Sequence, residues 1–184
     1  MNRIIALLDR ALASIERLGV AVAAVAFAAM MIVTVVDVVG RYALNSPLTW
    51  SFDLITAYLL VAGFFLAISA TQANRQHINI DLIARSLPPR LRAALLAPAF
   101  ATAVVFVLVI AWAGTAGFLD AWNKNLVMDG VIPWPRWPTY LLVALGAGLL
   151  ALRLTIDCLA LVVTAAGGAT NRDPFAHEHL GDAE

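Results

Sequence analysis

Cysteine and histidine are scarce in this chain of 184 residues, and their scarcity excludes several kinds of site. The single cysteine, Cys158, allows no intrachain disulfide and no cysteine-based metal site. The three histidines, His77, His177 and His179, all lie outside the long apolar runs of the chain. That placement argues against a haem held by two histidines across a membrane, and so against a cytochrome-like electron carrier.

Catalytic and nucleotide-binding motifs are absent as well. The sequence contains no Walker loop, no Rossmann glycine fingerprint and no HExxH motif, and no nucleophile and base are paired by their spacing. Lys and Arg together number 12, as do Asp and Glu, so there is no basic surplus to attract a nucleic acid. We therefore predict a protein that is not an enzyme, holds no cofactor or metal, and binds no nucleic acid.

Apolar residues dominate what remains. The chain is 62% hydrophobic and 13% charged, whereas soluble domains average about 45–50% apolar and about 25% charged residues. Its mean hydropathy is +0.86. Because about 20 apolar residues cross a bilayer core as a helix, the long apolar runs predict an all-α integral membrane protein with four transmembrane helices. We expect these helices at residues 18–39, 52–73, 92–119 and 139–166.

The two ends of the chain are more polar. In residues 1–17 Arg3, Arg10 and Arg17 recur every seven positions, opposite a stripe of Ile and Leu, and Glu16 shares their face. This pattern predicts an interfacial amphipathic helix with its charged face toward the headgroups. A signal peptide is the alternative, but the apolar run that follows is too long for one and ends in no convincing cleavage site.

Loop charges predict the orientation of the chain. Eight arginines lie in residues 1–17, in the link 74–92 and in the polar tail 167–184, against three basic residues in the other two links. Cytoplasmic loops carry the excess of Lys and Arg. We therefore expect both termini in the cytoplasm, with the tail disordered there and the Trp-rich link 120–140 on the opposite side.

Charged residues also occur in or near the predicted spans. Asp37 and Arg41 are four residues apart, so they share a helix face and can pair at the water interface. Arg153 and Asp157 have the same spacing near the end of the last span. Both lie at the far membrane face, as an interfacial or packing pair, if that span begins at Pro138. A deeper position would make them functional candidates.

Two short motifs resemble those of one transporter family. Arg41-Tyr42, followed by the segment 46–53 with Trp50 and Asp53, resembles the start of helix two in the small membrane subunit of tripartite ATP-independent periplasmic (TRAP) transporters, the DctQ-like type. The segment 75–81, RQHINID, resembles the end of the same helix. The order and spacing of the motifs agree over roughly residues 15–165. One departure is Asp53, where the family more often has Glu, so the charge is kept and the reach is shortened.

The resemblance implies a role that composition does not reveal. Such a chain is a small permease subunit of the bacterial inner membrane and scaffolds a large membrane subunit that holds the substrate and sodium sites. A periplasmic binding protein delivers an organic acid, such as a carboxylate or sugar acid. The motif residues become candidates for structural or subunit-interface roles: Arg41, Tyr42, Trp50, Asp53, Arg75, His77 and Asp81.

Two other functions are weighed against this one. A stand-alone four-helix exporter that acts as a homodimer would depend on Asp37, Arg153 and Asp157, the polar residues of the spans. A transporter of that kind needs a substrate site near the midplane, and the two acids, Asp37 and Asp157, are predicted toward the membrane faces instead. A membrane enzyme or electron carrier is the third class, and the missing motifs and histidines disfavour it.

Overall fold

The computed structural model describes residues 2–73 and 89–166. Regular structure in these two ranges is helical, apart from one isolated bridge between Val127 and Pro135. The elements are α1 (Asn2–Ala43), α2 (Ser51–Leu54), the π-helical segment η1 (Ile55–Leu59), α3 (Leu60–Ala73), α4 (Pro89–Asn123) and α5 (Trp137–Ala165).

Four of the described segments are long and apolar enough to cross a membrane. They are Leu12–Ala43, Ser51–Gln72, Ala93–Asn123 and Trp137–Ala165. The second consists of α2, η1 and α3, which follow one another without a gap. The predicted all-α membrane fold with four spanning helices is therefore confirmed.

The beginning of the chain is continuous with the first spanning helix. Sequence patterns predict a helix over 1–17 and a span over 18–39, and the structure joins both into the single helix α1. No proline interrupts this stretch, and Ala, Leu, Arg and Glu between positions 10 and 18 are strong helix formers. Once a helix is nucleated, each such residue extends it with one further hydrogen bond, so α1 continues through the predicted boundary.

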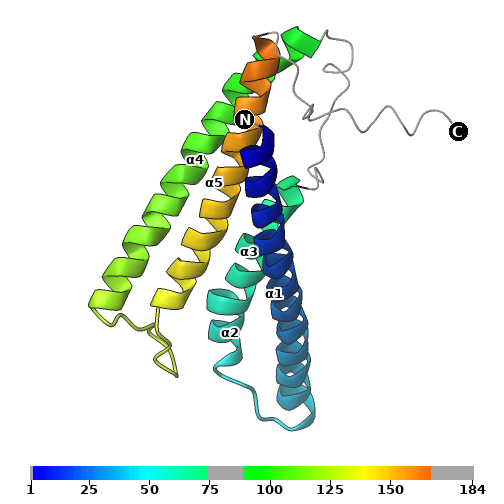
Figure 1. Cartoon of the computed structure of the whole chain (residues 1–184). Coiled ribbons are helices and arrows are strands. Elements are labelled where there is room, and N and C mark those ends of the chain that lie inside the picture. The colour runs from blue at the N-terminus through cyan, green and yellow to red at the C-terminus, as the bar shows by residue number, and fades with distance from the viewer. Residues whose placement is uncertain (1, 74–88, 167–184) are drawn as a thin grey trace, which may run out of the picture.

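The helices form a row in which each packs on its spatial neighbour. α1 packs on α3, α3 packs on α5, and α5 packs on α4 (Figure 1). In the most apolar stretch of α4 only 6% of the window is buried within the protein, whereas in that of α5 the share is 39%. The two ends of the row, α1 and α4, therefore present most of their apolar surface outward, as lipid or a membrane partner requires.

Glycines let the backbones meet on both sides of α3. A Cβ added to Gly19 of α1 would lie 2.9 Å from the carbonyl oxygen of Leu66, and one added to Gly146 of α5 would lie 2.2 Å from that of Phe65. Both distances are shorter than a real side chain allows. Small residues permit this close approach between helices in lipid, so α3 is held between α1 and α5 by consecutive backbone contacts.

The Trp-rich link folds back on itself at residues 124–136. Met128 N–H donates to the Trp134 carbonyl at 2.8 Å, and Arg136 N–H donates to the Leu126 carbonyl at 2.9 Å. Pro133 and Pro135 have no N–H to donate, which prevents a helix here. The link is therefore a hairpin-like turn with its own hydrogen bonds.

Candidate functional site

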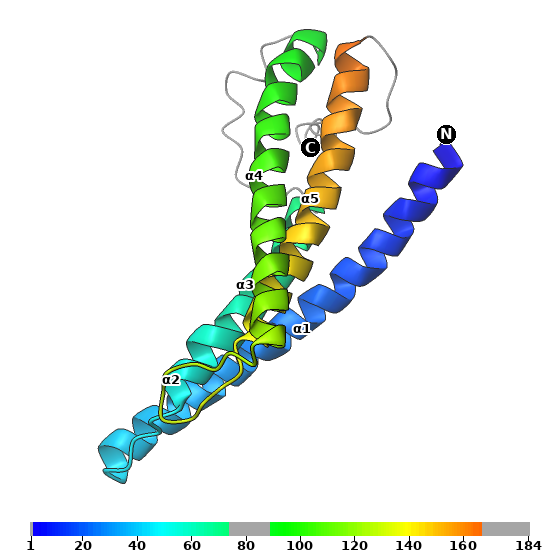
Figure 2. The ribbon, with the colours of Figure 1, turned by 90° about the vertical axis from the view of Figure 1, so that its left-hand side faces the viewer.

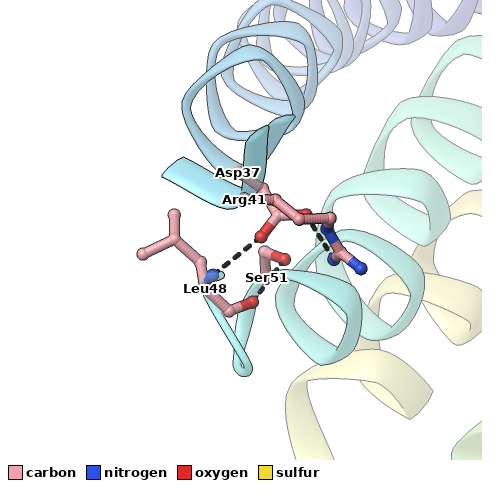
Figure 3. A network of polar contacts seen from close by, with 4 residues as sticks. All are labelled: Asp37, Arg41, Leu48 and Ser51. Atoms are coloured by element: carbon pink, nitrogen blue, oxygen red, sulfur yellow. Dashed lines mark hydrogen bonds and ion pairs between the residues drawn. The ribbon is translucent and has the colours of Figure 1, made fainter. Parts of the chain in front are cut away.

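A first polar cluster surrounds the link between α1 and α2. We call Asp37, Arg41, Leu48 and Ser51 the first-link network (Figure 3). Asp37 Oδ2 accepts a hydrogen bond from Arg41 Nη2 at 2.9 Å, and its Oδ1 accepts one from the Leu48 N–H at 2.8 Å. Ser51 Oγ donates to the Leu48 carbonyl at 2.8 Å. A single carboxylate thus joins the last turns of α1 to the link, and Ser51 joins the link to α2.

The ion pair that the spacing of Asp37 and Arg41 predicts is present in this network. The Arg41 side chain is 55% exposed and that of Asp37 is 14% exposed, so water reaches the pair mainly from the arginine side. Arg41 lies in the last turn of α1, where a cation also interacts favourably with the helix dipole. The network therefore stabilises the C-terminal end of α1.

The link 124–136 contacts the second spanning segment near its start. The Tyr58 hydroxyl donates to the carbonyl of Pro135, and the Tyr58 ring meets the edge of Trp134 with centroids 5.8 Å apart. Thr139 Oγ1 donates to the carbonyl of Ala57 at 2.9 Å. Tyr58, which donates, and Ala57, which accepts, both belong to η1. Such π-helical turns often occur at functional sites. The contacts place the two links at the same end of the row.

The first family motif lies at this end. Asp53 occupies the first turn of α2, where its charge suits the positive end of the helix dipole. A Cβ at Gly130 would lie 2.5 Å from Asp53 Oδ2, so the tip of the second link approaches this carboxylate closely. Trp50 is half-buried directly before α2, whereas Tyr42 is 83% exposed. The second motif, with Arg75, His77 and Asp81, lies outside the described residues.

A second polar cluster joins three helices. We call Glu16 of α1, Ser69 of α3 and Arg153 of α5 the three-helix cluster. Arg153 Nη2 lies 3.0 Å from Glu16 Oε2, and Ser69 Oγ donates to Glu16 Oε1 at 2.8 Å. The side chains of Arg153 and Glu16 are 10% and 4% exposed, and Ser69 is fully buried. An ion pair therefore lies inside the helix row, and a serine hydroxyl also donates to its carboxylate.

The predicted position of Glu16 is wrong. The recurrence of arginines every seven residues predicts Glu16 on a charged face toward the headgroups, yet it is buried. Another period in the same stretch indicates the buried face, because the buried positions of α1 alternate in steps of four and three. Between residues 12 and 26 they are Leu12, Glu16, Gly19, Ala23 and Ala26. This alternation is the spacing of a helix-packing seam. The position of Glu16 in that seam is the sequence signal for its burial, and the more conspicuous repeat of arginines points to the wrong face.

Arg153 and Asp157 each contact a different neighbouring helix. Arg153 reaches α1 through Glu16, whereas Asp157 Oδ2 accepts a hydrogen bond from Gln72 Nε2 of α3 at 3.3 Å. The two residues are one turn apart on α5 and so continue a polar connection along the α3 side of that helix. Each residue therefore connects α5 to another helix, although their spacing places both on one face of α5.

These contacts determine what the two clusters can do. Their carboxylates are held by arginine, serine or backbone groups, and all of these bonds except that between Asp37 and Arg41 join two segments of the fold. Within residues 2–73 and 89–166, no group of three or more His, Cys, Asp or Glu residues could hold a metal ion. The described polar residues therefore support a structural interpretation of both clusters.

Comparison with known proteins identifies a family. The model of the family described as tripartite ATP-independent periplasmic transporters, DctQ component, matches residues 30–164. The match covers more than half of the chain and includes the first-link network, the Trp-rich link and Arg153. It begins after Glu16. No curated protein matches the chain significantly.

Proposed function

Because this chain belongs to the DctQ component family of tripartite ATP-independent periplasmic transporters, we propose that it scaffolds the large membrane subunit of such a transporter. The chain is a multi-pass membrane protein and a small permease component. In the proposed role it keeps its partner in place during sodium-coupled uptake of an organic acid delivered by a periplasmic binding protein. The acid is a carboxylate or a sugar acid.

The open row of helices is the observation that supports a scaffold. α4 contacts α5 and leaves its opposite side apolar, with Phe106 67% and Trp112 74% exposed. α1 likewise exposes Met31 and Ile32, at 70% and 64%. A larger membrane subunit can pack along such a surface without any helix of the row having to separate. The internal polar contacts keep the row itself together, which is what a stationary support needs.

The proposed orientation places both termini in the cytoplasm of the bacterial inner membrane. It rests on the excess of arginine in residues 1–17, in the link 74–92 and in the tail. The first-link network and the link 124–136 then face the periplasm, where a binding protein arrives. Trp50 and Asp53 are proposed to shape this surface. For Arg75, His77 and Asp81, the proposal is that they order the cytoplasmic link.

Co-purification tests the proposed function directly. The tagged chain is extracted from its native membrane in a mild detergent, and the proteins that co-elute are identified by mass spectrometry. We expect a stoichiometric membrane partner with many more spans than this chain has. A homodimer that transports substrate alone in liposomes would contradict the proposal and favour a small exporter.

Two substitutions then test the proposed periplasmic surface. Trp50→Ala and Asp53→Ala are expected to weaken assembly or uptake in the reconstituted complex. Leu159→Ala is the control, because Leu159 is exposed on α5, away from both links and from the surfaces of α1 and α4 that are proposed to meet the partner. Wild-type assembly and uptake in both test variants would show that the roles assigned to Trp50 and Asp53 are wrong.

A further inference from the structure

We propose that the three-helix cluster is a positioning site that sets the register and direction in which α1 crosses α3 and α5. The cluster joins three spanning helices at one point, and its acidic member precedes the part of the chain that the family model matches. The inference concerns the internal architecture of the chain and does not depend on the partner or substrate proposed above.

The remaining buried contacts between α1 and α3 are apolar packing contacts. The other buried positions of its seam beyond Glu16 are Gly19, Ala23 and Ala26, which are small and apolar. In lipid, small apolar residues allow helices to approach, but the surrounding acyl chains are as apolar as the helices themselves. The Gly19 backbone beside Leu66 and the Phe27 ring against Gly63 favour the observed register through close packing alone.

The ion pair adds a polar preference for the same register. Only one register brings the Glu16 carboxylate within hydrogen-bonding distance of both Ser69 and Arg153. A shift of one turn displaces Glu16 by about 5.4 Å along its helix and would leave a charged carboxylate in apolar surroundings. Buried polar groups that select one register are the best-attested use of such pairs. The pair therefore penalises every other register by the cost of an unpaired buried charge, which apolar packing alone does not impose.

The direction of the N-terminal turns follows from this register. α1 crosses the other helices obliquely, and its first turns stand apart from α4 and α5 (Figure 2). Since α1 is uninterrupted from Asn2 to Ala43, its direction at Glu16 determines the direction of the turns before it. The three-helix cluster thus determines the direction of the N-terminal segment.

Distance measurements between spin labels test the proposed positioning. Labels at Leu18→Cys and Leu152→Cys report on α1 and α5 near the cluster, because both positions are exposed. The labelled full chain, with Cys158→Ser and its co-purifying membrane partner, is measured by pulsed EPR in lipid nanodiscs. We expect one narrow distance distribution for the otherwise unchanged chain. Glu16→Ala and Arg153→Ala should each add a second population, displaced by about 5 Å for a slip of one turn.

Two double variants separate register from general damage. The exchange Glu16→Arg with Arg153→Glu is expected to restore a single narrow distribution, including where the single variants accumulate poorly. The apolar pair Glu16→Leu with Arg153→Met should keep the thermal stability of the wild type while its distances remain broad. A control label pair at Leu108→Cys and Leu145→Cys, both exposed and located on α4 and α5, should be unchanged in every variant, because neither label is on α1.

Three outcomes would overturn the proposal. One is a wild-type distance distribution in both single variants. Another is an exchanged pair whose distances stay as broad as those of the single variants. The third is an apolar pair that is as narrow as the wild type, because packing alone would then set the register. Broad single variants, a recovered exchange and a stable but broad apolar pair together support it.

Discussion

The two ion pairs of this protein use the same chemistry in opposite settings. Asp37 and Arg41 are four residues apart on one helix, and the arginine is more than half exposed. Glu16 and Arg153 are 137 residues apart in the chain, and both are nearly inaccessible. The first pair can only fasten a helix end, whereas the second determines how three helices meet. Separation along the chain and access to water decide what an ion pair contributes.

Removal of the buried pair should have the largest effect. Arg153→Ala leaves the Glu16 carboxylate buried without its arginine, and breaking a buried pair in this way lowers the free energy of unfolding by about 3–5 kcal/mol. Thermal unfolding of the purified chain in detergent measures the loss. Arg41→Ala is the matched control, because removing an exposed partner changes stability by about 0–1 kcal/mol. Equal losses in the two variants would remove the contrast between the pairs.

A substitution at the backbone contact between α5 and α3 should have the second-largest effect. Gly146→Ala forces a methyl group to within 2.2 Å of the Phe65 carbonyl oxygen unless α5 moves away from α3. Overpacking of this kind destabilises by about 1–3 kcal/mol, and the distance favours the upper end. Gly148→Ala is the control on the same helix, since a Cβ there meets nothing within 4 Å. If both variants unfold at the same temperature, α3 and α5 are not held by backbone contact.

Loss of the Asp37 carboxylate should rank third. Asp37→Ala removes the acceptor for both Arg41 and the Leu48 N–H, so the link 44–50 keeps only the bond from the Ser46 N–H to the Gly40 carbonyl as its hydrogen bond to α1. We expect faster proteolysis within this link and a smaller decrease in unfolding temperature than Arg153→Ala causes. Asp37→Asn keeps an oxygen for Leu48 but loses the charge, and should fall between wild type and Asp37→Ala. Protection equal to wild type in Asp37→Ala would show that the link needs no such attachment.

The attachment of the second link should be the weakest of the four effects. Tyr58→Phe removes the hydroxyl that donates to the Pro135 carbonyl, and a neutral hydrogen bond contributes about 0.5–1.5 kcal/mol. Hydrogen exchange of amides in residues 126–136 should quicken, while that of α1 stays unchanged. Tyr42→Phe is the control, because Tyr42 is 83% exposed. Quicker exchange in both variants would mean that the Tyr58 hydroxyl has no special role.

Local patterns in the chain account for most of the fold. Four apolar runs predict four spanning helices, and their predicted bounds lie within a few residues of the observed ones beyond Ser51. The first helix differs because a polar period in residues 1–17 suggests a separate helix, while nothing in the backbone ends one there. The pair of Asp37 and Arg41 is predictable because its geometry depends only on the turn of a single helix.

Contacts between distant segments account for the rest. Leu48 is an apolar residue whose backbone N–H completes the first-link network, and no side-chain pattern reveals a backbone donor. The carbonyl of Pro135 accepts a hydrogen bond from Tyr58 because two links of different length meet at one end of the row. Such partners depend on where the chain returns in space, which hydropathy along the chain does not encode.

By itself, the sequence determined that this is a four-span membrane protein with the motifs of the DctQ component family, since hydropathy and motif spacing are properties of neighbouring residues. Only the tertiary structure decided that the helices lie in a row and that Glu16 is buried against Ser69 and Arg153. The physical reason is that a charge on a helix can face headgroups or a neighbouring helix. Which of the two it faces depends on the rotation of that helix against partners far away in the chain.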